Sequence, residues 1–400
     1  MDALISVAEA RAHVLATATR QPVEALSLAD ALGRVLAKPI ASPTALPPFD
    51  TSAMDGYAVR LDDLTDTPAC LPLSGTVYAG DPIPASLPHG HVMGIMTGAP
   101  LPPGTDGIIP VEWTIRAGDH VEVERAPTSQ QFIRRRGSAI DKGDFVFASS
   151  QLVTPGVMGM AAALGLPSLP VSTRPRVAVV STGDELVTPG DPLQPGQIWD
   201  ANGPGLAAQV IAAGGVVDGP HRARDTQESV AAVLDTSSSA DVLVIAGGVS
   251  MGERDLIRPE LERRGVEWQF WGVRQRPGKP FAFGTLDGRP VFGLPGNPVS
   301  AAVGFEMYVR PLLNAMVGHT SLQPERAVLS EPIPKPAGLH VFARVTATRD
   351  ASGTLLLSPA GPQGSHVART LSQSDGLAHL PESWTEAPAG TEVEFTPWRW

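Results

Sequence analysis

Residues 176–186 read Arg-Val-Ala-Val-Val-Ser-Thr-Gly-Asp-Glu-Leu, and this stretch decides the fold of the chain. The run Val177–Val180 is apolar and largely β-branched, which is typical of a strand that is buried on both faces of a parallel sheet. The run ends in a loop that carries hydroxyls, a glycine and two carboxylates. Because ligands bind beyond the carboxyl ends of the strands in a doubly wound sheet, this loop predicts a ligand site.

The same alternation of strand and helix continues to about residue 320. Further apolar runs lie at Val216–Val217 and Val242–Ala246, and helices are expected at about 204–213, 256–264 and 298–316. Asp225-x-x-Glu228 is expected to cap a further helix that runs through Leu234. Asp287-Gly288 lies between two strand-like runs, 281–286 and 290–294, and is a strong signal for a two-residue hairpin. The pattern predicts a central, doubly wound parallel α/β domain.

The flanking regions differ from this central region in composition and in the elements that they predict. Ser6–Glu9 is a capping box that predicts a helix to about Thr17, and a second helix is expected at Leu28–Leu36. Residues 41–142 and 321–400 are rich in Pro and Gly with short strand-like runs, so each predicts a small all-β domain. Thr154-Pro155 predicts a helix start, and Pro167–Pro175 has the composition of a linker.

These patterns predict a multidomain protein of the class α/β plus β. We expect a split helical unit from residues 1–40 and 143–175, a small β-domain at 41–142, an α/β domain at 176–320 and a β-barrel at 321–400.

Composition excludes several classes of function. The formal net charge is -11 over 400 residues, which disfavours a broad nucleic-acid-binding face. Cys70 is the single cysteine, so no intrachain disulfide can form, and a reducing cytoplasm is expected. The N-terminus lacks the long apolar region of a signal peptide, and the apolar stretch 156–171 is interrupted by Gly and Pro, so no membrane association is expected.

Three loops at strand ends carry the residue types of an anion site. They are Ser181–Leu186, Gly247–Asp255 and Gly293–Ser300. Glycines let backbone N–H groups approach a phosphate closely, and carboxylates suit Mg²⁺ that is also held by substrate phosphates. Any one of these loops could be a simple tight turn, but three at successive strand ends favour a binding site.

Basic residues gather at a few points along the chain. Arg276-Pro277-Gly278-Lys279-Pro280 sets two cations around a turn, which is either an oxyanion clamp or a solvated surface turn. Arg134–Arg136 has the same two interpretations. Asp225, which follows Arg222 and Arg224, is either a helix N-cap or a ligand of the site.

Six motifs appear in the order and spacing of the MoeA family, which includes the C-terminal enzymatic domain of gephyrin. The motifs are Pro47–Ala58, Ile95–Pro100, Thr182–Leu186, Gly247–Asp255, Pro277–Gly284 and Gly293–Ser300. The chain resembles this family over essentially its whole length. The resemblance implies an elongated, four-domain homodimer with a helical dimerisation segment. It further implies a pterin-binding domain at 176–320, and an active site between that domain and the β-domains of the partner subunit.

The resemblance also implies a reaction. Enzymes of this family insert molybdate into the dithiolene of an adenylated molybdopterin and release AMP, with Mg²⁺ as cofactor. The implied partners are adenylated molybdopterin, molybdate, a second copy of the chain, the upstream adenylyltransferase and the recipient molybdoenzymes.

Residue roles carry over position by position as implied by the resemblance. The acids expected around Mg²⁺ and pyrophosphate are Glu185, Asp225 and Asp255. Asp55 and Thr97 are expected to come from the partner's small β-domain, and Lys279 completes the catalytic set with Asp55 and the three acids. The expected substrate contacts are Thr97, Arg134, Thr182, Gly183, Gly247, Gly248, Ser250, Arg276, Pro295, Pro298, Ser300, Arg344 and Ser372, the last two of which resemble residues near molybdate.

One position departs from the family pattern. After the arginines the family usually has Gly-x-Asp-Ile, whereas this chain has Gly137-Ser138-Ala139-Ile140. If residues 139–141 are extended, Asp141 points to the same side as Ala139, at about 6.6 Å along the strand. Asp141 then replaces the missing acid in part; the competing hypothesis is that Ala139 marks an inactive or specialised paralog.

Two other functions remain open at this stage. One is the adenylyltransferase reaction itself, on a related central domain, although that activity needs neither the extra β-domains nor a dimerisation segment. The other is a non-catalytic molybdopterin-binding protein or scaffold.

Overall fold

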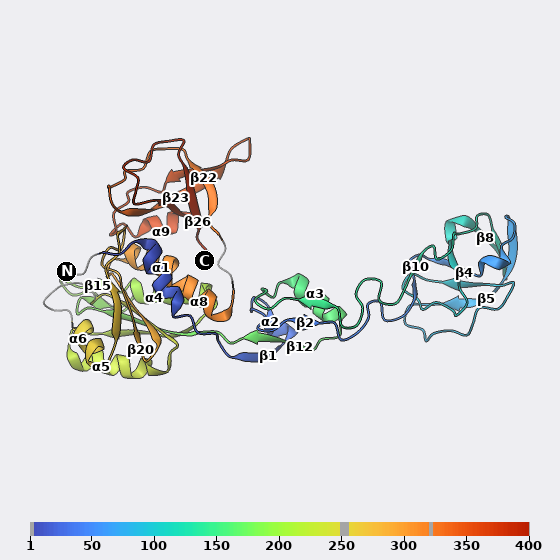
Figure 1. Cartoon of the computed structure of the whole chain (residues 1–400), viewed down its shortest axis with the longest axis horizontal. Coiled ribbons are helices and arrows are strands. Elements are labelled where there is room, and N and C mark those ends of the chain that lie inside the picture. Colours follow the sequence, from blue (N-terminus) through green and yellow to red (C-terminus); the bar gives the residue numbers. More distant parts are fainter. Residues whose placement is uncertain (1–3, 249–255, 320–322, 400) are drawn as a thin grey trace.

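The computed structural model describes residues 4–248, 256–319 and 323–399. The molecule is elongated (Figure 1). A large body contains the central sheet and the C-terminal β-domain, a narrow hinge unit follows in the middle, and a small arm domain lies at the far end. We use the names body, hinge unit and arm domain for these three parts throughout.

The body is built on a six-stranded sheet with the order β16-β13-β17-β21-β20-β18. Its strands are β13 (Arg176–Thr182), β16 (Val216–Ala223), β17 (Val242–Ala246), β18 (Glu267–Trp271), β20 (Ala282–Leu286) and β21 (Arg289–Leu294). The first four in the sheet order are parallel, whereas β20 runs antiparallel to both of its neighbours, β21 and β18. The expected hairpin joins β20 to β21, and both Asp287 and Gly288 have positive φ, as a type I′ turn requires.

Helices cover both faces of this sheet, which confirms the doubly wound class. On one face, Val177 and Val179 pack with α4 (Asn202–Ala212), α7 (Pro298–Gly304), a π-helical turn (Phe305–Val309) and α8 (Arg310–Val317). On the other face, Ala178 and Val180 pack with α5 (Gln227–Thr236) and α6 (Ile257–Arg263). Successive residues of β13 alternate between the two cores, because side chains along a strand point to opposite faces.

The N-terminal helix α1 (Val7–Ala16) begins at the expected capping box, where Ser6 and Glu9 bond reciprocally. Its buried residues Val7, Ala10 and Val14 lie at helical spacing and join the core of the central sheet. The structure therefore places this helix on the body, whereas the sequence analysis grouped it with the split helical unit.

The hinge unit is a small two-layer structure. It contains β1 (Val23–Ser27), α2 (Leu28–Ala31), β2 (Ile40–Ala41), β11 (Phe145–Phe147), α3 (Pro155–Ala163) and β12 (Ser168–Ser172). The segment that was predicted as a linker, Pro167–Pro175, contains β12, which pairs antiparallel with β1. The helix predicted at Leu28–Leu36 ends already at Ala31, because the chain turns away through Gly33 at φ 73°.

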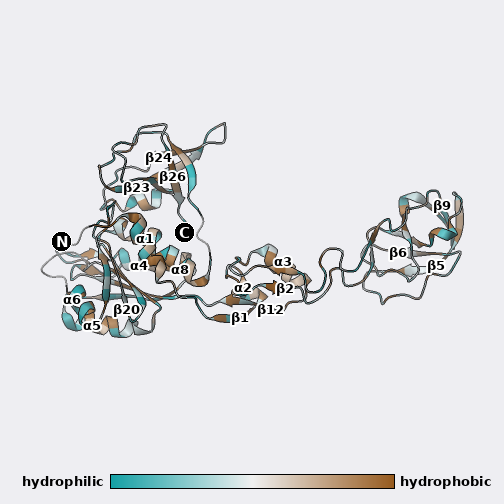
Figure 2. Cartoon of the chain, viewed as in Figure 1, coloured by the Kyte–Doolittle hydropathy of each residue, from teal (hydrophilic) through white to brown (hydrophobic). Residues whose placement is uncertain are grey.

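The hinge unit also carries apolar residues that remain exposed. Helix α3 is mostly hydrophobic in Figure 2, yet only its residues Val157 and Ala161 are buried. Leu32 and Phe145, also in this unit, are 52% and 69% exposed. Large exposed apolar residues gathered on one small unit are a feature of protein interfaces.

The arm domain is an all-β unit. Its six-stranded sheet has the order β7-β4-β6-β5-β9-β8. The strands are β4 (Gly56–Val59), β5 (Ala69–Val77), β6 (Val92–Ile95), β7 (Gly107–Pro110), β8 (Thr114–Ala117) and β9 (His120–Val123). A separate pair, β3 (Thr51–Ser52) with β10 (Ile133–Arg134), lies where the two connections from the hinge unit enter.

The C-terminal domain is a closed five-stranded barrel. Its strands are β22 (Glu325–Leu329), β23 (His340–Arg349), β24 (Leu355–Pro359), β25 (Gly376–Leu380) and β26 (Glu392–Pro397). The order β23-β24-β22-β26-β25 closes because β25 also pairs with β23. The short strand β19 (Gln275–Arg276) of the α/β domain adds to β23, and so joins the two parts of the body. Among the residues described, no helix is long and apolar enough to cross a membrane.

Candidate functional site

The strand register brings three predicted loops to one edge of the central sheet. Thr182 pairs with Ala223, Ser181 with Ala246, and Ala246 with Leu294. The segments that follow these strand ends are therefore neighbours, as expected for the carboxyl edge of a parallel sheet.

Thr182, Gly247 and Gly248 form a narrow cradle at this edge. A Cβ atom on Gly247 would lie 2.8 Å from the Thr182 Oγ1, and one on Gly248 would lie 3.0 Å from the same atom. Both glycines have positive φ (92° and 62°), so the loop requires glycine for its backbone as well as for space. The Thr182 Oγ1 is buried and has no hydrogen-bond partner within the described part of the chain. A buried hydroxyl without a partner fits a ligand oxygen.

Acidic side chains stand at the rim of the cradle. The Glu185 carboxylate is exposed and folds over Gly183, and Asp225 is half-buried at the end of β16. The Asp225 N–H donates to Asp184 Oδ1 at 3.1 Å, so Asp184, to which the sequence analysis gave no role, belongs to the same rim. Two predicted residues of the second loop, Ser250 and Asp255, lie outside the described residues.

The acidic rim fits Mg²⁺ only with help from a substrate. Among the described residues, no group of three His, Cys, Asp or Glu side chains has the geometry of a metal site. Glu185 and Asp225 supply two carboxylates, and Mg²⁺ in phosphate-binding sites is commonly held by one or two carboxylates together with phosphate oxygens and water. The donor set therefore suits an ion that arrives with an anionic substrate.

Asp200 and Asn202 support the cradle from below, and sequence reasoning missed both. The buried Asp200 accepts from Ser181 Oγ at 2.5 Å and from the Gly203 N–H at 2.9 Å. Asn202 donates to the Gly296 carbonyl at 2.7 Å and thereby ties α4 to the third loop. The signal was available, since Asp200-x-Asn202 immediately precedes a helical pattern and Asp and Asn favour helix starts.

The third loop joins the cradle to the Arg276–Lys279 turn. Pro295 and Ser300 are buried, and Pro298 occupies the first turn of α7. A Cβ atom on Gly278 would lie 3.6 Å from the Ser300 carbonyl oxygen, so the turn lies against the start of α7. Gln275 holds the turn by donating to the carbonyls of Pro277 and Gly278, each at 3.2 Å, and by accepting from the buried Tyr308 hydroxyl.

Arg276 and Arg344 line a pocket of about 340 Å³ between the turn and the barrel. Arg344 is fully buried; its guanidinium donates to Thr370 Oγ1 at 2.8 Å and to the carbonyls of Pro362 and Gly364 at 3.2 and 3.3 Å. Its Nη1 has no partner within the residues described. Burial, and secondly the charge of Arg276, lower the pKa of Arg344 to about 10, so this side chain is still a cation at neutral pH.

The two remaining predicted residues of this region are peripheral in the described structure. Lys279 is exposed and stands three residues after Arg276 on the same turn. Ser372 is exposed on α9 (Arg369–Gln373), where its hydroxyl donates to the Arg369 carbonyl at 2.9 Å. The same helix carries Thr370, which holds Arg344, so α9 contacts the pocket through Thr370 rather than through Ser372.

A second group of predicted residues lies in the arm domain. The Thr97 N–H and hydroxyl both donate to Asp55 Oδ1 at 2.7 Å. These hydrogen bonds, that of the backbone first, lower the pKa of Asp55, which is therefore an exposed carboxylate at neutral pH. Arg134 on β10 pairs with Thr51, and Thr51 also bridges Pro100, so the segments around residues 51, 97 and 134 meet at one end of the arm domain.

The arm residues and the strand-end residues do not meet within one chain. The hinge unit separates the arm domain from the body (Figure 1), so Asp55, Thr97 and Arg134 lie far from Glu185 and Asp225. The structure therefore divides the predicted site into a body half and an arm half.

The segment around Ala139 differs from the geometry considered above. Ser138 and Ala139 form a bend and Ile140 bridges Leu46, so residues 139–141 are not an extended strand. Asp141 nevertheless lies close to the arginine turn, because a Cβ atom on Gly137 would be 3.2 Å from the Asp141 carboxyl carbon. The carboxylate therefore folds back over Gly137.

Comparisons with known proteins cover nearly the whole chain. Three family models match it in order: the MoeA N-terminal region (domains I and II) at residues 5–165, a probable molybdopterin-binding domain at 178–315, and the MoeA C-terminal region (domain IV) at 326–398.

Relatives with established names match at similar length. The chain is 40% identical to molybdopterin molybdenumtransferase 2 of Mycobacterium tuberculosis over 379 residues, covering 92% of this chain and 93% of that protein. It is 36% identical to the molybdopterin molybdenumtransferase of Haemophilus influenzae over 94% of this chain and 93% of that one. A crystal structure of the molybdopterin biosynthesis MoeA protein of Pyrococcus horikoshii superimposes with a TM-score of 0.85 at 27% identity, covering 99% of this chain and all of that one.

Proposed function

Because the chain belongs to the MoeA family of molybdopterin molybdenumtransferases, we propose that its body half binds an adenylated molybdopterin together with molybdate and releases AMP on transfer. The protein is an enzyme of molybdenum cofactor biosynthesis that inserts molybdenum into molybdopterin. The observation that carries the proposal is the buried Arg344 cation, whose unpartnered Nη1 and neighbour Arg276 suit a small oxyanion.

The strand-end cradle would receive the pyrophosphate of the substrate. The groups that suit phosphate oxygens are the Thr182 hydroxyl, the backbone N–H of Gly248, and the first turn of α7 with Pro298 and Ser300. The N–H groups of Gly183 and Gly247 already donate to the carbonyls of Ala223 and Leu294, so these two glycines would contribute close approach of the backbone rather than donors. Glu185 and Asp225, with Asp255, would hold Mg²⁺ against the same pyrophosphate. When bound, this ion would neutralise charge that develops on the phosphate oxygens.

The arginine pocket would hold molybdate beside the pterin. It lies next to the Arg276–Lys279 turn, which in turn contacts Ser300 at the edge of the cradle. Molybdate in this pocket would therefore lie within reach of a pterin substrate that extends across the Arg276–Lys279 turn. Catalysis by these residues rests on positioning and charge stabilisation, and no side chain is assigned as a general base.

A second copy of the chain would complete the site. Asp55, Thr97 and Arg134 are separated from the body half of their own chain, and the exposed apolar residues of the hinge unit supply a surface for association. We infer a homodimer in which the arm domain of one subunit meets the body half of the other. The proposal also assigns the enzyme to the reducing cytoplasm, where it would exchange its substrate and product with the upstream adenylyltransferase and the recipient molybdoenzymes.

The proposed reaction is tested by incubating the protein with adenylated molybdopterin, molybdate and Mg²⁺. We expect release of AMP that depends on both molybdate and Mg²⁺. Consumption of ATP with unadenylated molybdopterin would instead identify the adenylyltransferase activity, and the absence of both reactions would leave a binding protein.

Two variants of the Arg276–Lys279 turn test whether its positive charges bind the anionic substrate. We expect Lys279→Ala to weaken molybdate or pterin-phosphate binding by at least about tenfold, since it removes a hydrogen-bonding cation beside an anion. Arg276→Lys keeps the charge, so its effect should be smaller. Isothermal titration calorimetry with molybdate compares the two variants, and equal binding by the parent and Lys279→Ala would assign Lys279 to solvent.

Ala139 and Asp141 decide between an active enzyme and a specialised paralog. We expect Asp141→Asn to abolish AMP release and Ala139→Asp/Asp141→Asn to restore it, because an aspartate at either position could supply one carboxylate near the arginine turn. A neutral Asp141→Asn variant would end the substitute-acid hypothesis. An inert parent that gains activity through Ala139→Asp alone would support the paralog instead.

A further inference from the structure

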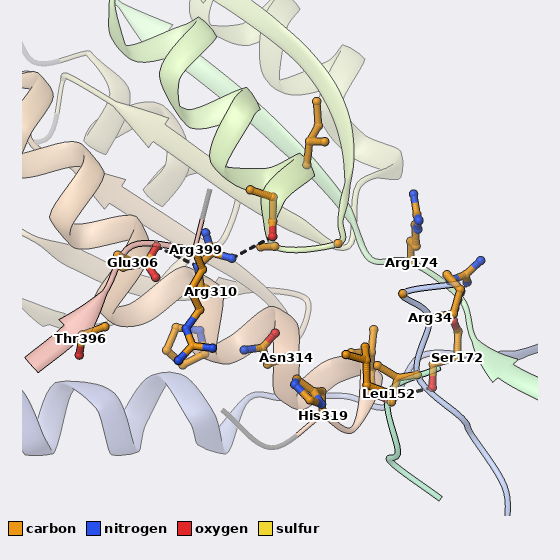
Figure 3. A pocket seen from close by; sticks show the side chains of 18 of the residues that line it. Arg34, Leu152, Ser172, Arg174, Glu306, Arg310, Asn314, His319, Thr396 and Arg399 are labelled. Carbon is orange, nitrogen blue, oxygen red and sulfur yellow. Dashed lines mark hydrogen bonds and ion pairs between the residues drawn. The ribbon is translucent and has the colours of Figure 1, made fainter. Parts of the chain in front are cut away.

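A second pocket, of about 420 Å³, lies where the body meets the hinge unit (Figure 3), and it shares no lining residue with the arginine pocket described above. Its wall comes from three parts of the chain: the hinge unit, the helices of the α/β domain, and the end of the C-terminal barrel. Its volume lies in the range of small-molecule sites.

The wall of this pocket is strongly basic in a protein whose net charge is -11. Five of its residues are arginines, and its single acidic residue is Glu306. The arginines are Arg11, Arg34, Arg174, Arg310 and Arg399. Such a gathering of cations around one cavity creates a local positive potential that attracts anions.

Two of the five charges are matched by carboxylates. Arg310 donates to Glu306 at 2.8 Å, and Arg34 donates to Glu24 at 2.5 Å. Within the described chain, the side chains of Arg11, Arg174 and Arg399 make no hydrogen bond or ion pair, although the charge of Arg399 acts on Glu306. The pocket therefore keeps an excess of positive charge.

Arg310 is a buried member of this wall. Its side chain is 7% exposed and also donates to the Ala212 carbonyl at 3.1 Å. The remaining nitrogen, Nη2, is buried and has no partner within the residues described. A buried guanidinium nitrogen without an acceptor is costly unless an acceptor is supplied from outside.

The cations stand at two ends of the pocket. Figure 3 shows Glu306, Arg310 and Arg399 together at one end, with Arg34 and Arg174 at the other. Apolar side chains, among them Ile211 and Met307, contribute to the wall as well. A ligand with phosphate groups and a flat apolar part would satisfy both kinds of surface.

We propose that this pocket binds a phosphate-bearing small molecule of roughly nucleotide size. Because residues from the hinge unit and the body both line the pocket, the bound ligand would connect the two. If the shared site of the proposed function is correct, the ligand would thereby restrict the position of the arm domain. The binding itself does not depend on that function.

The test uses ATP and inorganic phosphate as probes, without Mg²⁺, on the full chain by isothermal titration calorimetry. We expect both to bind, with ATP the tighter. Arg174→Ala/Arg399→Ala should weaken ATP binding about a hundredfold, at about tenfold for each lost charged hydrogen bond. Arg174 is exposed and Arg399 half-buried, so neither change opens a cavity in the core, and thermal unfolding confirms that the variant is folded.

Two control variants locate the binding. Arg116→Ala, on the exposed surface of the arm domain, should bind ATP like the parent. Lys279→Ala alters the proposed substrate site, and should leave the part of the ATP binding that depends on Arg174 and Arg399. Parent protein that binds neither probe would overturn the proposal. So would ATP binding that survives Arg174→Ala/Arg399→Ala, or that is lost in Lys279→Ala alone. A parent that binds neither probe while Arg174→Ala/Arg399→Ala changes its self-association would assign the pocket to acidic side chains of a second copy.

Discussion

Glu185→Gln should lower the rate of AMP release by a factor on the order of 10²–10³, while leaving the fold intact. The substitution removes one negative charge and keeps the size of the side chain. The Glu185 carboxylate is exposed at the strand end and accepts no hydrogen bond from the residues described, so the core loses no contact. The proposed loss is therefore specific to holding Mg²⁺ and pyrophosphate.

The control for this variant is an acidic residue in the same loop segment, a few residues after Glu185. Asp191→Asn changes an exposed acid at the far side of the small β14–β15 pair (Leu186–Val187 with Ile198–Trp199). We expect it to turn over like the parent. Rates are measured at saturating Mg²⁺ and again across a Mg²⁺ titration, and a Glu185→Gln variant as fast as the parent would remove this residue from the site.

Arg344→Met should strongly weaken molybdate binding. Methionine has a similar length but no charge, so the oxyanion loses the buried cation that faces the pocket. A fall in affinity on the order of 10²-fold is expected when a charged hydrogen bond in a buried site is lost together with its ion pair. Removing the unpartnered Nη1 favours the variant, whereas losing the hydrogen bonds to Thr370, Pro362 and Gly364 disfavours it, so thermal unfolding must show that the variant is folded before its binding is compared.

Arg349→Met is the matched control, because Arg349 lies on the same strand, β23, and is exposed. Calorimetry with molybdate and thermal unfolding are run on both variants. If Arg344→Met bound molybdate as tightly as the parent, the pocket between the barrel and the Arg276–Lys279 turn would not be the oxyanion site.

Local signals in the sequence predicted the elements of the body well. The capping box at Ser6 marks the start of α1, Asp287-Gly288 forms the expected hairpin, and the buried run at Val177–Val180 is the centre of the sheet. The strand-end loops were found for the same reason: glycines and carboxylates that follow a buried strand have few structural explanations.

Features that depend on distant contacts were missed. Pro167–Pro175 has the composition of a linker, but its backbone pairs with Val23–Ser27, which is distant in sequence. The helix α1 carries only Val7, Ala10 and Val14 as its buried stripe, and nothing in those residues indicates whether they pack on the hinge unit or on the body. The β-barrel at 321–400 was expected, but the strand pair β23–β25 that closes it and the addition of β19 from another domain depend on tertiary pairing.

The residues of the candidate site show the same difference between local sequence signals and distant contacts. Thr182, Gly247 and Gly248 could be predicted because their loops follow strands, whereas the supporting Asp200 and Asn202 act through contacts with residues 181 and 296. That Asp55 and Thr97 lie in an arm far from the body half could not be read from local patterns, since it depends on the extended course of the hinge unit.

The central claim is that each active site is built from the body of one subunit and the arm of another. It is tested most directly with two inactive variants, Asp55→Asn in the arm and Glu185→Gln in the body, carried on differently tagged chains and purified as a mixed dimer. One site of that dimer would carry both substitutions and the other neither, so we expect about half of the parental rate of AMP release, from a species of twice the chain mass. A mixed dimer as inactive as either variant alone, or a parent protein that sediments as a monomer, would contradict the shared site.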